Sequence, residues 1–320
     1  MWIEQYIEMK YPKNSKEIKL EEAMELKYNH IPSSLYKYRG YSKYSVQNLK
    51  NDSVWFNSAD KLNDPFDSAL VIKTEQYMKR RIALATFKAL PNIVHKHGIE
   101  ISEEEINALS SESIEVILKT VLKRVPDYKD EQIEEIIKAV LGVMKDMEES
   151  HTLEQVKKSR ETTFLSCFSE VNDSMLMWSH YAHSHTGFCL EYNFKKPDRE
   201  IILTRALNPV IYREELLDIS EYLIHGINHG LEFNNLISTY WTMIKSSDWA
   251  YEKEWRIVFP LLKGEGFNRA LFKPETIYLG TEISQEHKRE LIGIAKSKQI
   301  RLFQMKKETN GFKLVPEQIL

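Results

Sequence analysis

The chain has 320 residues, of which 42% are hydrophobic and 28% are charged, and its formal net charge is −3 at pH 7. This balance is typical of a globular protein with a real core, and it provides no overall attraction to a membrane or to nucleic acid, although a local basic groove for nucleic acid stays open. Two cysteines are too few for a disulfide framework or a cysteine-based zinc site. The sequence has no signal-peptide pattern and no run of ~18 apolar residues, so we expect a cytoplasmic protein without a membrane partner.

Short helices and strands alternate in the amino-terminal part of the sequence. Residues 1–30 indicate a helical lead-in, and residues 42–50 form a pattern typical of an amphipathic helix. The segments 35–39 (LYKYR) and 54–56 (VWF) are rich in aromatic and branched side chains, which predicts two strands.

A polar loop at residues 57–67 follows the second strand. Asn63 is expected to close an Asx turn, and Pro65 keeps Asp64 out of the helical region. Asn63, Asp64 and Asp67 either brace this turn or project into a cleft, and the sequence leaves both interpretations open.

The middle of the chain is helical. Ser102 and Glu105 have the spacing of a capping box, and the apolar stripes at 114–122 and 133–144 are typical of helices that pack one face inward. We therefore expect a helical insertion at residues 74–160 within a single α+β domain that spans residues 1–320.

Strands return after the helical segment. Residues 162–169 and 187–194 predict two strands, and a short helix capped by Asn172, Asp173 or Ser174 lies between them.

The carboxyl-terminal part continues the alternation of elements. We expect a strand at 209–212, a helix over 214–246, a strand at 276–280 and a helix over 285–298. A strand at 300–305 is expected to close the folded part of the chain.

Two glutamates precede an alternating segment, SSDWAYEKEWRIVF, at residues 246–259. Residues two apart on a strand point to one face, so Glu252, Glu254 and Arg256 are predicted to lie side by side on a half-buried strand. Adjacent carboxylates repel each other and are costly to bury. They line a cleft, bind a cation, or form a solvated strand end paired with nearby lysines or with Arg256.

Three histidines follow the short helix. His180 and His183 have a spacing that metal ligands use, with an acid as a third ligand, but they can equally pack beside Trp178 and Tyr181. We assign no metal site, and the sequence has no phosphate-binding or dinucleotide-binding glycine motif.

Four blocks of sequence resemble a large, mostly uncharacterised bacterial family, a domain of unknown function often noted near phage-defence genes. The blocks are LYKYR, FNSADKLNDPFD, FLSCFSEVNDSMLMWSHYAHSHTGFCLEY and DWAYEKEWRIVF, in this order. The resemblance covers residues 35–67 and 162–305. With it we expect an α+β fold with a split, twisted, mixed β-sheet, flanking helices and the helical insertion.

A weaker resemblance suggests a mechanism. A basic residue on a first strand, a serine on a second strand and a late Glu-x-Glu are similar to the layout of ADP-ribosyltransferases. That resemblance implies that Arg39 holds the NAD pyrophosphate or ribose and that Ser166 or Ser169 orients the nicotinamide ribose. It also implies that Glu254 is catalytic, with Glu252 as its companion.

Aromatic residues complete this predicted site. Trp178, Tyr181 and Tyr38 are candidates to stack on nicotinamide or adenine, and Tyr36 and Tyr38 compete with Arg39 for the role on the first strand. The other cleft candidates are Asn63, Asp64, Asp67, His180, His185 and Arg256.

We therefore expect an ADP-ribosyltransferase-like enzyme or NAD glycohydrolase that consumes NAD, acts in anti-phage defence, and uses an unknown macromolecular acceptor or partner. One alternative is a non-enzymatic module that senses a nucleotide or a partner. Another is a metal-dependent nuclease that uses Asp64, Asp67, Glu252 and Glu254.

Overall fold

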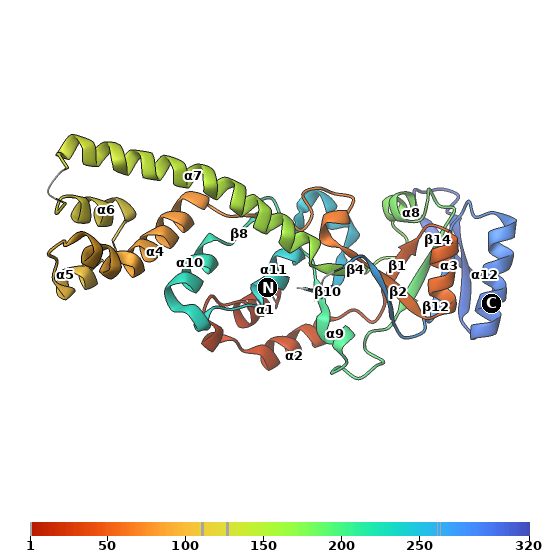
Figure 1. The fold of residues 1–320 in the computed structure, drawn as a ribbon. Helices are drawn as coiled ribbons and strands as arrows, with labels where there is room; N and C mark the ends of the chain where they lie inside the picture. Colours follow the sequence, from red (N-terminus) through yellow and green to blue (C-terminus); the bar gives the residue numbers. More distant parts are fainter. Residues whose placement is uncertain (1, 110–111, 126–127, 261, 263) are drawn as a thin grey trace.

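The computed structural model describes residues 2–109, 112–125, 128–260, 262 and 264–320 (Figure 1). The α-helices are α1 Trp2–Lys10, α2 Leu20–His30, α3 Lys43–Lys50, α4 Thr74–His97, α5 Glu103–Ala108, α6 Ile114–Leu122, α7 Asp130–Glu161, α8 Met175–Tyr181, α9 Ile202–Ala206, α10 Ser220–His229, α11 Ile237–Tyr240 and α12 Gln285–Lys298. The strands are β1 Leu35–Arg39, β2 Ser53–Ser58, β3 Leu70–Val71, β4 Phe164–Ser169, β5 Phe188–Tyr192, β6 Leu207–Pro209, β7 Ile211–Arg213, β8 Leu217–Asp218, β9 Ile244–Ser246, β10 Glu254–Phe259, β11 Phe267–Ala270, β12 Thr276–Leu279, β13 Arg301–Lys307 and β14 Leu314–Gln318. The predicted α+β class is confirmed.

Ten strands of the described chain form one mixed, mostly antiparallel sheet in the order β11-β2-β4-β1-β5-β12-β13-β14, and β10 joins β4 to β6. Only β12 and β13 run parallel within this sheet, as far as the described residues go. Short two-stranded sheets, β3-β8 and β7-β9, lie beside it.

The sheet opens at β4. Strand β10 pairs along the whole length of β4, from Glu254 opposite Ser169 to Phe259 opposite Phe164, and thus occupies one edge. Because a strand has two edges, β1 and β2 share the other. Strand β2 pairs with the first two residues of β4, and β1 pairs with the last residue of β4, Tyr36 lying opposite Ser169. The stretch 166–168 between these contacts faces a gap between β1 and β2, which explains the split sheet.

Both faces of the sheet are covered. On one face, Phe164 and Ile257 join an apolar cluster with α3 and α12. On the other face, the next residues along each strand, Leu165 and Val258, pack with α1 and α11. Strand β10 is therefore buried on both sides rather than half-buried as expected, and only its last residue, Phe259, is partly exposed.

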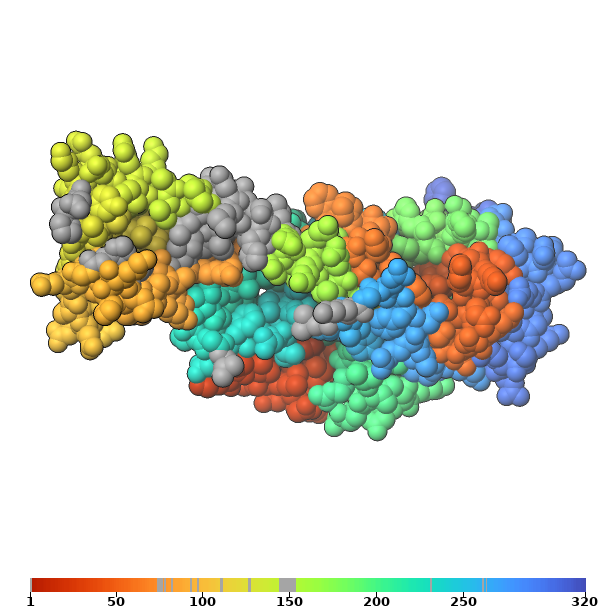
Figure 2. Space-filling view, viewed as in Figure 1, coloured from red at the N-terminus to blue at the C-terminus, as the bar shows by residue number. Residues whose placement is uncertain are grey.

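Helices α4 to α7 extend away from the sheet, and α7 brings the chain back to β4 (Figures 1 and 2). Their buried side chains, among them Leu90, Ile114 and Ile117, form an apolar cluster of their own. The predicted capping box is confirmed, because the Ser102 side chain accepts from the backbone N–H of Glu105, whose carboxylate accepts from the backbone N–H of Ser102. No helix in the described residues is long and apolar enough to cross a membrane.

Three expectations about the bounds of elements are wrong. The strand expected at 209–212 is divided at Val210 into β6, which pairs with β10, and β7, which pairs with β9. Residues 214–246 do not form one helix, because Gly230 has a φ of 57° after α10 and Asn234 then donates to the carbonyls of Lys10 and Pro12. The chain also continues beyond β13 into β14, which contains Pro316. An edge strand such as β14 tolerates proline because its outer N–H groups need no partner strand.

Candidate functional site

A cavity of about 350 Å³ lies at the gap in the sheet. Its walls come from β1 and β2, its floor from β4, and one end from Tyr181 and the segment around Glu252. The predicted site residues that line it are Tyr36, Tyr38, Arg39, Asn63, Asp67, Ser166, Ser169, Tyr181, Glu252 and Glu254. Residues far apart in the sequence thus meet in one cavity.

A buried cluster of charges, Asp67, Lys245, Glu252, Glu254 and Arg256, forms the anionic end of this cavity. The guanidinium of Arg256 bonds both oxygens of Asp67, at 2.7 and 2.6 Å, and both oxygens of Glu254, at 2.7 and 2.9 Å. The ammonium of Lys245 donates to Glu254 at 2.9 Å and to Glu252, and lies 3.5 Å from Asp67. We call these five residues the charged cluster; three carboxylates face two cations.

The two glutamates meet for a different reason from the one predicted. Glu252 ends a 3-10 helix, η6 Ser247–Glu252, and Lys253 takes a left-handed φ of 44° before β10 begins at Glu254. The prediction that both residues lie on one strand is therefore wrong. The carboxylates are joined by Lys245 of β9, whereas Glu254 and Arg256 do share a strand face as expected.

The charged cluster divides its two glutamates chemically. Burial would raise the pKa of Glu254, but the charges of Arg256 and Lys245 outweigh it and hold that pKa well below its usual range. For Glu252, burial and the charge of Glu254 raise the pKa despite Lys245. Glu254 is thus firmly ionised, while Glu252 is the carboxylate that takes up a proton more readily.

Glu252 is tied to Tyr181 and to β4. The Tyr181 hydroxyl donates to Glu252 Oε1 at 2.7 Å, and burial followed by the charge of Glu252 raises the pKa of that hydroxyl. The Ser169 hydroxyl donates to the backbone carbonyl of Glu252 at 2.6 Å. Asn63 reaches the Tyr181 hydroxyl at 3.5 Å. The polar side chains at this end therefore fix the position of Glu252 rather than leaving it mobile.

Lys37 was not among the predicted site residues, yet it crosses the gap from β1 to β4. Its ammonium donates to Ser166 Oγ at 2.8 Å and to the carbonyl of Cys167 at 2.9 Å, at the edge of β4 that neither β1 nor β2 pairs with there. Burial and the nearby charge of Arg39 lower the pKa of Lys37 to about 8. A lysine in the middle of the strand LYKYR was the available signal.

Arg39 lies next to Lys37 on the same wall. Burial lowers its pKa. Within the described part of the chain, neither Lys37 nor Arg39 forms an ion pair with a carboxylate, and the Arg39 guanidinium makes no side-chain hydrogen bond. Sheltered cations without counter-ions favour the binding of an anion.

Several predicted aromatic and histidine residues lie away from this cavity or are engaged by other residues. The Trp178 ring is fully buried, with its indole N–H bonded to the Asn172 carbonyl, so it is not open to a ligand. His185 stacks on Trp178, and His180 packs near Trp249. Tyr38 lines the cavity, but its ring packs edge-on against Trp178 and its hydroxyl donates to the Val171 carbonyl.

The polar loop also differs from the prediction. Asp64, not Asn63, closes the Asx turn by accepting from the backbone N–H of Phe66 at 2.9 Å. Asp64 therefore braces the loop outside the cavity, whereas Asp67 joins the charged cluster. The space between Asp67, Glu252 and Glu254 holds the ammonium of Lys245. Among the described residues, no three His, Cys, Asp or Glu side chains are arranged to hold a metal ion.

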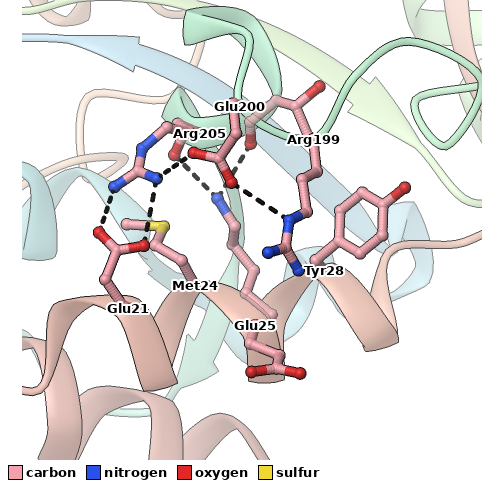
Figure 3. Close-up of a pocket in the computed structure, with 9 residues that line it drawn as sticks. Glu21, Met24, Glu25, Tyr28, Arg199, Glu200 and Arg205 are labelled. Carbon is pink, nitrogen blue, oxygen red and sulfur yellow. Dashed lines mark hydrogen bonds and ion pairs between the residues drawn. The ribbon is translucent and has the colours of Figure 1, made fainter.

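A second hollow, between α2 and α9, is built from paired charges (Figure 3). Arg205 bonds Glu21 and Glu200, and Lys27 donates to the carbonyls of Thr204, Arg205 and Leu207 at 2.7 to 3.0 Å. These bonds fix the end of α9 and leave its cations partnered, so we assign this hollow a structural role.

The comparisons with known proteins reach only part of the site. A family described as protein of unknown function (DUF2971) matches residues 177–257. No protein of curated function and no solved structure matches this chain significantly. The matched segment holds Tyr181 and four members of the charged cluster, but not β1 and β2. Over this segment the chain is similar to a family to which no activity is assigned.

Proposed function

We propose that this chain cleaves the nicotinamide–ribose bond of NAD and passes the ADP-ribosyl group to water or to a macromolecular acceptor. One observation carries the proposal: a single cavity joins two buried glutamates at one end to two cations on its wall, Lys37 and Arg39, for which the described residues provide no carboxylate partner. An NAD molecule has a matching order of groups, with a reactive ribose beside an anionic diphosphate.

The order of residues along β4 indicates how NAD would lie in the cavity. Ser169, at the end of β4, lies beside Tyr36 and bonds the backbone of Glu252, whereas Lys37 bonds Ser166 three residues earlier. A strand rises ~3.3 Å per residue, so Ser169 at the glutamate end and Ser166 at the cation end are separated by roughly 10 Å. Lys37 and Arg39 would bind the diphosphate while the nicotinamide ribose lies toward Glu252.

The two glutamates suit different parts of the reaction. Breaking the glycosidic bond builds positive charge on the ribose carbon, which a fixed, ionised carboxylate such as Glu254 stabilises. Glu252, with its raised pKa, is suited to accept the proton of the attacking water or acceptor. Tyr181 orients Glu252 for this step through its hydrogen bond.

Nicotinamide release from NAD tests the proposal, with and without cell extract as a source of acceptor. Glu252→Gln keeps the shape of the side chain and leaves two carboxylates facing two cations, so we expect the cluster to stay folded. We expect release to fall by about 100-fold or more, the usual size of a general acid–base contribution. Glu191→Gln is the matched control, because Glu191 is also buried and hydrogen-bonded but lies outside the cavity. Equal release by Glu252→Gln and wild type, or no release by wild type in either condition, would contradict the proposal.

A second candidate, a module that senses a nucleotide without cleaving it, is favoured by one feature of the charged cluster. Lys245 and Arg256 already occupy most acceptor positions on Glu254. A sensor would bind NAD, which raises the melting temperature by mass action, yet release no nicotinamide. Binding with cleavage favours the enzyme, and binding without cleavage favours the sensor.

A further inference from the structure

An exposed tryptophan stands on the β2 wall of the cavity. Trp55 is 39% exposed and lines the cavity, although its neighbours Val54 and Phe56 are buried in the core. The benzene ring of its indole lies against Gly266, where an added Cβ would come within 2.3 Å of Cζ2 and 2.8 Å of Cε2. Gly266 thus leaves the room that the indole needs, while part of the ring stays exposed.

Asn57 follows on the same side of β2, because residues two apart on a strand point the same way. It lines the cavity, and its carboxamide makes no hydrogen bond to another residue in the described ranges. A carboxamide offers one acceptor and two donor hydrogens, which match the edge of a purine base. An aromatic ring beside an unused carboxamide is the chemistry of a nucleobase site.

The position of Asn57 also fits a base rather than the reacting group. Asn57 pairs with Leu165 near the start of β4, whereas Glu252 bonds Ser169 at its end. Lys37 bonds Ser166, between these two points. The sequence of groups along β4 is therefore carboxylate, cation and carboxamide, in the order of the reactive ribose, the diphosphate and the second base of a dinucleotide. Trp55 lies on the same face of β2, two residues before Asn57.

We propose that Trp55 and Asn57 form a purine subsite, in which the base stacks on the indole that packs against Gly266 and its edge bonds the Asn57 carboxamide. This subsite deepens the proposed function and rests on it for the orientation of the dinucleotide. It makes NAD selection depend on the adenine end, far from the bond that breaks.

Equilibrium binding of AMP, ADP-ribose and inorganic pyrophosphate to the full chain tests the subsite. We expect Trp55→Ala to weaken AMP and ADP-ribose by about tenfold, the size of one base stacking on an aromatic ring, and to leave pyrophosphate unchanged. Trp55→Phe should stay within about threefold of wild type because a phenyl ring still stacks. Gly266→Ala should also weaken AMP, since its methyl group meets both the indole and the backbone carbonyl of Phe56.

Tyr44→Ala is the matched control, because Tyr44 is an 81% exposed aromatic residue outside the cavity. Unchanged AMP affinity in Trp55→Ala, or an equal loss of pyrophosphate, would overturn the subsite. The two proposals fail separately. Trp55-dependent AMP binding without nicotinamide release would reject only the enzyme, and normal release with an unchanged KM for NAD in Trp55→Ala would reject only the subsite.

Discussion

Two arginines on neighbouring parts of the sheet differ in their partners. Arg256 is fully buried, and its guanidinium bonds both oxygens of Asp67 and of Glu254. Arg39 is half-buried, lines the cavity and has no carboxylate partner in the described chain. A charge that the protein itself satisfies supports the fold, whereas a sheltered charge that it leaves unsatisfied is available to a ligand.

The largest effect should follow from breaking the charged cluster. Arg256→Met leaves Asp67 and Glu254 buried with one cation between them, and we expect a loss of about 3–5 kcal/mol in the free energy of unfolding. Urea unfolding measures this loss. The control is Arg205→Met, which removes the partly exposed ion pairs to Glu21 and Glu200 and should cost less than ~1 kcal/mol. Equal losses in both variants would show that the cluster does not support the fold.

Arg39→Met should give the opposite pattern. It removes a sheltered charge without a partner, so we expect the free energy of unfolding to be unchanged or slightly higher. The affinity for pyrophosphate should fall by about tenfold or more, because a charge-assisted hydrogen bond contributes ~1.5–3 kcal/mol. Calorimetric titration measures the affinity. A destabilised variant that still binds pyrophosphate normally would show that Arg39, like Arg256, stabilises the fold and does not bind the ligand.

The pH dependence of binding sharpens the role of Lys37. Burial and Arg39 lower its pKa to about 8, so the ammonium is charged below pH 8 and loses its proton as the pH rises through that value. ADP-ribose affinity should therefore fall above about pH 8, somewhat later in the complex because a bound anion raises the pKa. In Lys37→Arg the fall should disappear, since arginine stays charged in this range. A fall of equal size in this variant would assign the titration to another group.

The smallest effect should come from Tyr181→Phe. Losing one hydrogen bond to Glu252 should cost about 1 kcal/mol of unfolding free energy. Burial and Glu254 raise the pKa of Glu252 while Tyr181 lowers it, so that pKa should rise further. The acid limb of the nicotinamide-release profile should move to higher pH, as initial rates from pH 5 to 8 will measure. An unmoved limb would separate Tyr181 from Glu252.

The sequence predicted the positions of strands better than it predicted which strands pair with each other. Alternating or aromatic segments located β1, β2 and β4 because such patterns reflect burial along a single strand. They carry no information on pairing between distant segments. The gap at residues 166–168 arises because β1 and β2 share one edge of β4, and that sharing is decided by the whole sheet.

The sequence predicted which residues lie together in part, and partly for the wrong reason. Glu252 and Glu254 do lie together, but through Lys245 and the left-handed turn at Lys253 rather than along one strand. Trp178 was expected in the cleft because of its chemistry, whereas helix α8 buries its ring. Trp55 was taken only as a strand residue, since nothing in a single sequence tells which side of a strand faces a cavity.

A crystal structure of the protein with ADP-ribose tests the central claim most directly, because this product cannot be cleaved further at the bond in question. We predict the diphosphate within hydrogen-bond distance of Lys37 and Arg39, and the free ribose carbon toward Glu252. ADP-ribose bound elsewhere on the protein, or an empty cavity at saturating ligand, would contradict the assignment of the unsatisfied cations as the ligand site.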